Sequence, residues 1–215
     1  MSVEQDKATV DTVVWDFGAV LFRWRPRVLL AASLPSRVKD DISAAHWHEQ
    51  FFQSFGGDWA EFDRGTVAVD DLAGRIARRT GLTEAEAMAV IDAVPHELQP
   101  LADTVGLVHA LHERGVRQFY LSNMPAPYAD HLEREHAFVR DFEDGVFSGR
   151  VQLIKPEPAI YALAEQRFGL VPERTVFIDD HPKNVEAARA RGWQAVLATH
   201  HAAIHQGLAE LGLLG

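Results

Sequence analysis

The chain has no cysteine among its 215 residues. This absence excludes disulfide bonds, thiolate nucleophiles and zinc sites with cysteine ligands. No stretch approaches the roughly 20 apolar residues that a membrane-spanning helix needs. The polar N-terminus also lacks the apolar run of a secretory signal peptide. We therefore expect a cytoplasmic location and no membrane partner.

Positive charge is also scarce. The 21 Lys and Arg residues are outnumbered by 31 Asp and Glu residues, which gives a formal net charge of -10, and the basic residues are scattered evenly. Without a basic patch, the chain is not expected to bind nucleic acid. An anionic small substrate would need cations placed locally at its binding site.

Apolar residues make up 47% of the chain, which is enough to bury a core. Three helical patterns end near a glycine, and each is followed by a short apolar run typical of a buried strand. These runs are Arg117–Leu121, Thr175–Ile178 and Gln194–Leu197, and a further run, Thr12–Trp15, lies near the N-terminus. Helices and buried strands in alternation predict an α/β fold with a mostly parallel sheet.

The long stretch between the first strand and the next, residues 25–100, has helical periodicity but no convincing strand. It is too long for a simple crossover between parallel strands. Within it, Thr83 and Glu86 have the spacing of a capping box that opens a helix. We predict that residues 25–100 form an inserted helical cap and that the core consists of residues 1–24 and 101–215.

Polar residues stand where three of the apolar runs end. In chain order they are Asp16, then Ser122 and Asn123, then Asp179 and Asp180. Taken singly, each also suits a helix cap or a turn. Adjacent carboxylates at the end of a buried strand, however, repel one another unless a cation or hydrogen-bond donors compensate them. Because ligands bind outside the carboxyl ends of the strands in an open α/β sheet, we expect these side chains to share one crevice.

Four segments carry a more specific pattern. They are Asp16-Phe17-Gly18-Ala19-Val20-Leu21, Leu121-Ser122-Asn123, Lys155-Pro156-Glu157-Pro158 with Tyr161, and Phe177-Ile178-Asp179-Asp180 with Asn184. In this order they resemble the motifs of the haloacid dehalogenase superfamily. Within subfamily IA they are most similar to the branch that holds the N-terminal phosphatase domain of soluble epoxide hydrolases and the sugar-1-phosphate phosphatases. The resemblance implies a Rossmann-like core with a cap inserted after the first motif, and a phosphatase that acts on a small phosphorylated metabolite.

The resemblance also implies that Asp16 is the nucleophile and forms an aspartyl-phosphate intermediate. A carboxylate that attacks a phosphate dianion brings like charges together, so the site must supply cations. Mg²⁺ suits this role because it takes hard oxygen ligands, usually one or two carboxylates plus the substrate phosphate. We expect Asp16 and Asp180 to be metal ligands first, with Asp179 next. The resemblance adds the backbone carbonyl of Gly18.

Four other residues are candidates for catalysis, substrate binding or support. Lys155 would offset negative charge near the nucleophile and the phosphate, which makes it a catalytic and a substrate-binding candidate. Ser122 is a candidate for both roles, since its hydroxyl and the adjacent N–H groups would hold a phosphate oxygen. Asn123 is a further substrate-binding candidate. Asn184 stands near a helix start, where it either orients the acidic pair or caps the helix.

Gly18 departs from the family pattern. Most phosphatases that the chain resembles carry a second Asp at this position, which acts as general acid and base. Such assistance is worth roughly 10²–10⁴ in rate. We therefore expect a preference for good leaving groups, such as those of sugar-1-phosphates or acyl phosphates, and a rate that falls steeply as the leaving group becomes more basic. His46 and His48 in the cap are candidate replacements, although a histidine there is more often packing or surface.

Two other functions stay open. A 2-haloacid dehalogenase uses the same Asp nucleophile and Lys without a metal, but it does not keep the paired acid that this chain has at Asp179 and Asp180. A binding protein on a degenerate phosphatase scaffold is favoured by Gly18 and disfavoured by the other motif residues.

Two further groups of polar residues lie outside the motifs. Arg23 and Arg25 either contact substrate anions or form a solvated hinge with Trp24 packed beneath. Three histidines near the C-terminus are predicted to lie on a solvated surface helix, and not in a metal site. They are His200, His201 and His205.

Overall fold

In the computed structural model of the chain, residues 9–214 are described. Their strands form a five-stranded sheet with the order β3-β2-β1-β4-β5, and every neighbouring pair is parallel. The strands are β1 (Thr12–Trp15), β2 (Arg117–Ser122), β3 (Asp144–Phe147), β4 (Thr175–Asp179) and β5 (Gln194–Leu197). This order is that of a doubly wound Rossmann-like sheet, in which ligands bind where the order reverses, here between β1 and β4. The predicted α/β fold with a mostly parallel, Rossmann-like sheet is confirmed.

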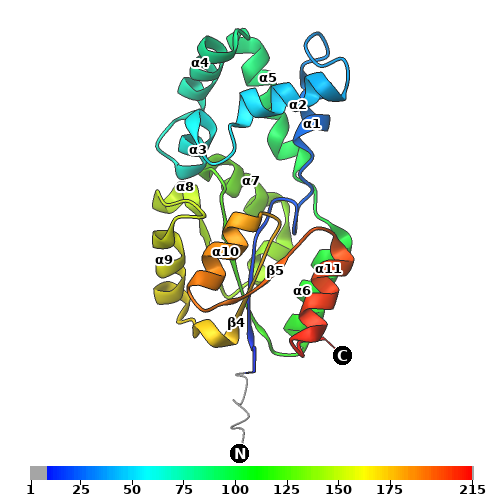
Figure 1. Cartoon of the computed structure of the whole chain (residues 1–215), viewed down its shortest axis with the longest axis vertical. Coiled ribbons are helices and arrows are strands. Elements are labelled where there is room, and N and C mark those ends of the chain that lie inside the picture. The colour runs from blue at the N-terminus through cyan, green and yellow to red at the C-terminus, as the bar shows by residue number, and fades with distance from the viewer. Residues whose placement is uncertain (1–8, 215) are drawn as a thin grey trace, which may run out of the picture.

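The sheet separates two hydrophobic clusters. Val13 and Trp15 of β1 belong to one cluster and Val14 belongs to the other, because successive side chains of a strand point to opposite faces. The first cluster includes side chains of α6 (Ala102–Glu113), α7 (Ala126–Glu135) and α11 (His201–Glu210), and the second those of α9 (Pro158–Phe168) and α10 (Pro182–Ala190). Figure 1 shows α9 and α10 on one side of the sheet and α6 and α11 on the other.

Strand β3 was not predicted, and its composition explains why. Its sequence, Asp144 to Phe147, contains one glycine and begins with a charged residue, so it lacks the apolar run of the other strands. Gly145 is required by its neighbour, since a Cβ at this position would lie 2.0 Å from Cζ of Tyr120. Because the ring of Tyr120 occupies the space that a side chain at position 145 would need, this strand has a glycine there. It therefore lacks an apolar residue that would have indicated a strand in the sequence.

Five helices lie between β1 and α6, in the segment predicted as the cap. They are α1 (Pro26–Ser33), α2 (Asp41–Phe52), α3 (Gly57–Arg64), α4 (Val69–Thr80) and α5 (Glu84–Glu97). Helix α5 opens with the predicted capping box, in which Thr83 and Glu86 bond to each other's backbone N–H groups. Figure 1 shows the five helices gathered beyond one end of the sheet, with α3 next to α8 (Ser148–Val151). The division into core and cap stays a prediction, and residues 1–8 of the predicted core lie outside the described part of the chain.

The chain enters and leaves this helical segment through two adjacent connections. The N–H of Arg23 donates to the carbonyl of Gln99, and the N–H of Leu101 donates to the carbonyl of Leu21, at 2.8 Å each. The guanidinium groups of Arg23 and Arg25 both bond the carboxylate of Glu97 at the end of α5. The two arginines therefore join the two connections through Glu97 and do not line the pocket described below.

The C-terminal histidines lie on or next to α11. His200 and His205 are exposed, as predicted for a surface helix, whereas His201 is half-buried.

Two short 3₁₀ segments, η1 (Ala137–Asp141) and η2 (Pro172–Arg174), complete the connections. Across residues 9–214, none of the helices combines the length and the apolar character needed to cross a membrane.

Candidate active site

The sheet register brings two acidic residues side by side. Trp15 of β1 pairs with Ile178 of β4. The residues that follow them, Asp16 just after β1 and Asp179 at the end of β4, therefore lie side by side. The N–H of Asp16 also donates to the carbonyl of Ile178 at 2.9 Å. On the other side of β1, Ser122 ends β2 and is buried. Asp16, Ser122 and Asp179 therefore converge at the carboxyl ends of three neighbouring strands, as predicted.

Lys155 lies between two carboxylates. Its Nζ is 2.8 Å from Oδ1 of Asp16 and 2.6 Å from Oδ2 of Asp179, and only 1% of its side chain is exposed. Burial acts to lower the pKa of Lys155, but the charges and hydrogen bonds of the two aspartates outweigh it, so the pKa lies above its ordinary value. The result is a buried ammonium group shared by two carboxylates.

The amide of Asn123 holds the segment that carries this lysine. Its Nδ2 donates to the carbonyl of Lys155 at 3.0 Å, and its Oδ1 accepts from the N–H of Lys155 at 2.8 Å. These reciprocal bonds link the end of β2 to the loop before α9. Both polar groups of the side chain are used in this contact.

Asp179 and Asp180 have different surroundings although they are adjacent. The carboxylate of Asp179 accepts hydrogen bonds from Asn184 Nδ2 at 3.0 and 3.1 Å and from the N–H of His181 at 2.8 Å, in addition to its contact with Lys155. No side chain among the described residues pairs with Asp180. Burial, followed by the negative charges of Asp16 and Asp179, raises the pKa of Asp180.

Two observations indicate that a cation fits beside these residues. One carboxylate oxygen each of Asp16, Asp179 and Asp180 lie within 4.8 Å of one another. Asn184 lines the same pocket, and its Oδ1 is buried without a hydrogen-bond partner among the described residues. Water bound to a metal ion is a hydrogen-bond donor of the kind this oxygen lacks. Burial also raises the pKa of Asp16, which reflects the cost of a carboxylate at this depth.

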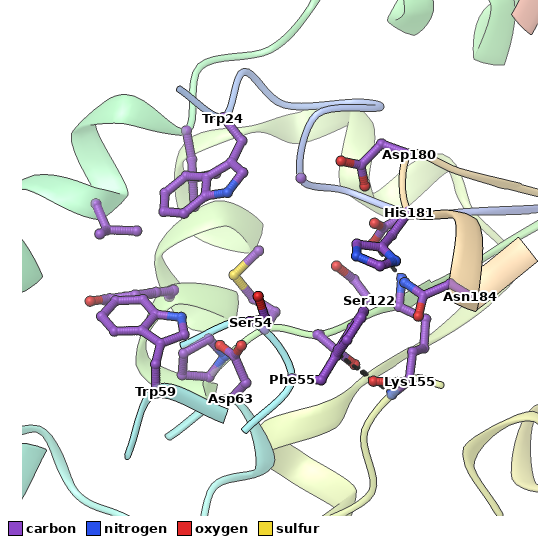
Figure 2. Close-up of a pocket in the computed structure, with 18 residues that line it drawn as sticks. Trp24, Ser54, Phe55, Trp59, Asp63, Ser122, Lys155, Asp180, His181 and Asn184 are labelled. Atoms are coloured by element: carbon purple, nitrogen blue, oxygen red, sulfur yellow. Dashed lines mark hydrogen bonds and ion pairs between the residues drawn. The ribbon is translucent and has the colours of Figure 1, made fainter. Parts of the chain in front are cut away.

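Asp16, Ser122, Lys155, Asp180 and Asn184 line the floor of a pocket of about 220 Å³ between the sheet and the helical segment of residues 25–100. Figure 2 shows Ser122, Lys155, Asp180 and Asn184 on one side and Trp24, Trp59 and Asp63 on the other. The wall facing the floor is largely apolar. Its members are Trp24, Trp59, Val94, Leu98, Met124 and Tyr128, whereas Phe55 lies beside His181, with 4.4 Å between the ring centroids.

Asp63 of α3 and His181 also line the pocket, and neither was identified from the sequence. Asp63 stands in an ordinary amphipathic helix, where no local signal separates it from other surface acids. The two histidines proposed as replacements for the missing acid lie elsewhere. His46 is exposed and His48 packs against Phe52, and neither is among the residues that line the pocket.

Comparisons with known proteins agree with the fold and with the motifs. The sesquiterpene phosphatase AstK of Aspergillus oryzae is 29% identical over 185 residues, which cover 86% of this chain and 87% of that protein. Haloacetate dehalogenase H-2 of a Moraxella species is 30% identical over 97 residues, 45% of this chain and 43% of that protein. A haloacid dehalogenase family enzyme of Bacteroides thetaiotaomicron, solved with magnesium and inorganic phosphate, superposes with a TM-score of 0.67 at 20% identity. It covers 86% of this chain and 92% of that one, and at this identity it shows the fold alone.

The family itself is shown by a match to a family model. Residues 10–192 match the model of the haloacid dehalogenase-like hydrolases. This range includes every motif residue from Asp16 to Asn184. The chain therefore belongs to the haloacid dehalogenase-like hydrolase family.

Proposed function

We propose that the chain is a magnesium-dependent phosphatase that hydrolyses small phosphate monoesters through an aspartyl-phosphate on Asp16. The observation that carries this proposal is the contact of Asp16 with the buried Lys155 at 2.8 Å, beside an unpaired Asp180. Sequence similarity to a phosphatase over most of both chains supports it further, whereas the sequence similarity to haloacetate dehalogenase H-2 covers less than half of the chain.

The surroundings of Asp16 suit a nucleophile. Its Oδ1 accepts a hydrogen bond from the N–H of Phe17 at 2.7 Å and also contacts Lys155, which fixes the orientation of the carboxylate. Lys155 offsets the negative charge that would otherwise repel a phosphate dianion. Ser122, at the end of β2, lines the same floor and provides a hydroxyl for a phosphate oxygen.

Asp16, Asp180 and the backbone carbonyl of Gly18 are the residues we propose as holders of Mg²⁺. Two carboxylates and one lysine together carry a net negative charge beside the phosphate. When bound, the ion would supply the positive charge that these residues lack. We propose that Asp179, predicted as a third ligand, instead holds Lys155, because its oxygens accept from Lys155, Asn184 and His181. Asn184 supports this arrangement through its amide.

Asn123 was predicted to bind substrate. Because its amide group is engaged with the backbone of Lys155, we propose that the side chain positions this lysine. The helical segment of residues 25–100 then serves as the cap over a core of residues 1–24 and 101–215, since it contributes Trp59, Val94 and Leu98 to the wall opposite the floor.

The substrate we propose is a small monoester whose organic group contacts the apolar wall. Trp24 and Trp59 offer large apolar surfaces to that group, and a buried polar group would lose hydrogen bonds to water there. This favours an apolar ester of the class named for the similar sesquiterpene phosphatase over the sugar phosphate predicted from Gly18. A screen of both classes decides between them.

The test is phosphate release by wild type and Asp16→Asn, with Mg²⁺ and with chelator. Wild type should release phosphate only with Mg²⁺, and the variant should be inactive but folded, because an amide cannot attack phosphorus. Asp92→Asn is the matched control, as Asp92 is exposed on α5 and does not line the pocket. Halide release from 2-haloacids without metal would favour the dehalogenase instead, and no release from any compound would favour a binding protein.

A further inference from the structure

The pocket contains one acidic side chain that the proposed chemistry has not used. Asp63 lies on α3 and lines the pocket with Asp16 and Lys155. Figure 2 shows its carboxyl oxygens pointing into the pocket from the Trp59 side. Among the described residues, its carboxyl takes part in neither a hydrogen bond nor an ion pair, in contrast to Asp58 on the same helix, which pairs with Arg79 at 3.0 Å.

Contacts with the core hold this part of α3 in place. The Oγ of Ser148, at the start of α8, donates to the backbone carbonyl of Asp63 at 2.5 Å. The next residue, Arg64, donates two hydrogen bonds to the carboxylate of Glu157, at 2.9 and 2.6 Å. Glu157 is only two residues from Lys155. The segment that carries Lys155 therefore also holds the end of α3, and with it Asp63, in place.

Glycines allow this close approach. Gly65 ends α3 with a φ of +83°, and a Cβ there would lie 2.3 Å from the backbone oxygen of Gly149 in α8. The backbones of α3 and α8 thus touch directly at the residues that follow Asp63. A carboxyl group on a rigidly docked helix keeps a fixed position relative to the catalytic floor.

The electrostatic environment of Asp63 favours its protonated form. Burial, and then the negative charge of Asp16, raise its pKa well above the ordinary value, although Lys155 acts in the opposite direction. A raised pKa brings a carboxyl closer to the range in which proton donation and acceptance by a catalytic group are most effective.

The other titratable groups of the pocket are less suited to proton transfer. The hydroxyl of Tyr128 donates to the carbonyl of Ile91 at 2.8 Å. Burial lowers the pKa of His181, which favours its neutral form, and its Nδ1 accepts from the N–H of Lys183 at 3.2 Å. Lys155 and Asp180 belong to the charged floor.

We propose that Asp63 is the general acid and base of this hydrolase and supplies from the cap the proton that Gly18 cannot supply. The inference rests on the proposed phosphatase function. In the first step, a carboxylate oxygen of Asp16 forms a bond to phosphorus and the bond from phosphorus to the ester oxygen breaks. The leaving oxygen takes the electron pair of that bond and the proton of Asp63, so a neutral alcohol departs.

The second step reverses the role of Asp63. Its carboxylate removes a proton from a water molecule whose oxygen attacks the phosphorus of the aspartyl-phosphate. The bond from phosphorus to Asp16 breaks, and its electron pair returns to the carboxylate. Asp63 is again protonated and the phosphate leaves, so one ester and one water give one alcohol and one phosphate.

The test compares wild type, Asp63→Asn and the control Asp58→Asn on aryl and alkyl phosphates of similar size. In Asp63→Asn, kcat/KM for alkyl phosphates should fall by about 10²–10⁴, and that for p-nitrophenyl phosphate by much less, because only the basic leaving group needs the proton. A plot of log kcat/KM against leaving-group pKa should therefore be shallow in wild type and in Asp58→Asn and steep in Asp63→Asn. An equal loss on all esters, or no loss, overturns the proposal.

Rapid-mixing experiments separate this inference from the proposed function. Asp63→Asn should release a burst of p-nitrophenol equal to the enzyme concentration and then turn over slowly, because the intermediate waits for a base. Asp16→Asn should give neither burst nor turnover. A wild type without phosphatase activity contradicts the proposed function, whereas an active wild type with an unchanged slope in Asp63→Asn contradicts only the role of Asp63.

Rescue provides a second readout. A Cβ built on Gly18 meets nothing within 4 Å, and the φ of this residue is not in the left-handed region, so the backbone accepts a residue with a side chain there. Adding Gly18→Asp to Asp63→Asn should restore part of the activity on alkyl phosphates and flatten the slope again. A merely structural role of Asp63 predicts no such recovery of the slope.

Discussion

The ammonium group of Lys155 lies 2.6 Å from Oδ2 of Asp179, and both side chains are buried. With the contact to Asp16, this pair places one positive and two negative groups in the interior. The desolvation cost of such groups is offset only while all partners are present. The free energy of unfolding should therefore depend on the charges of Lys155, Asp16 and Asp179.

Lys155→Met should therefore destabilise the fold. It leaves two buried carboxylates without their shared cation, for which we expect a loss of about 3–5 kcal/mol in the free energy of unfolding. Urea denaturation at neutral pH measures this loss. Lys183→Met is the control because Lys183 is exposed, and its effect should stay within about 0.5 kcal/mol. Equal effects of the two substitutions would contradict the role of the buried pair.

Mg²⁺ should raise the melting temperature of the wild type. At about 100 times Kd, binding to the folded state alone contributes about 2.7 kcal/mol, or about 5–10 °C for a chain of this size. Asp180→Asn should abolish the shift, because we propose Asp180 as a direct ligand. Asp179→Asn should instead lower the melting temperature without metal, since Asp179 holds Lys155. A full shift in Asp180→Asn would contradict this assignment.

The contact between α3 and α8 is tested by a pair of glycine substitutions. Gly65 and Gly81 both end helices with positive φ, so alanine costs about 1–2 kcal/mol at either position. Only at Gly65 does a Cβ meet backbone, at 2.3 Å, whereas nothing lies within 4 Å at Gly81. Gly65→Ala should therefore lower both the melting temperature and kcat more than Gly81→Ala. Equal kcat values would show that docking of α3 does not matter for catalysis.

The pairing of Glu97 with Arg23 and Arg25 predicts a pH-dependent contribution to the free energy of unfolding. Burial alone would raise the pKa of Glu97, but hydrogen bonds from Arg25 and Arg23 lower it below the ordinary value. A carboxyl with a lowered pKa stabilises the fold above its unfolded pKa of about 4.3, and this contribution disappears as the pH falls through its folded pKa. Glu97→Gln should cost about 1–2 kcal/mol at pH 7. The difference from wild type should vanish in strong acid, and a difference independent of pH would contradict the assignment.

The dependence of kcat/KM on leaving-group pKa distinguishes the prediction made from Gly18 in the sequence from the prediction made from Asp63 in the structure. Gly18 alone predicts a steep dependence in the wild type, since no residue of the first motif donates a proton. Asp63 predicts a shallow dependence, because the donor comes from the cap. A single series of esters assayed with the wild type distinguishes the two.

The sequence determined the parts of this protein that depend on neighbouring residues. Strands β1 and β5 have the predicted bounds, because short apolar runs mark them locally. The convergence of Asp16, Ser122 and Asp179 was also predictable, since the carboxyl ends of parallel strands meet at one edge.

Only the tertiary structure decided which residues surround that edge. The bond from Ser148 to Asp63 spans 85 positions in the chain, and the pair of Arg64 and Glu157 spans 93. No periodicity or spacing indicates a contact at such separation, because the sequence around each residue carries no information about its distant partner. The same holds for β3, where the ring of Tyr120 required Gly145. The sequence therefore determined the family and the acidic floor of the pocket, and the docking of distant helices decided the pocket wall and the place of Asp63 in it.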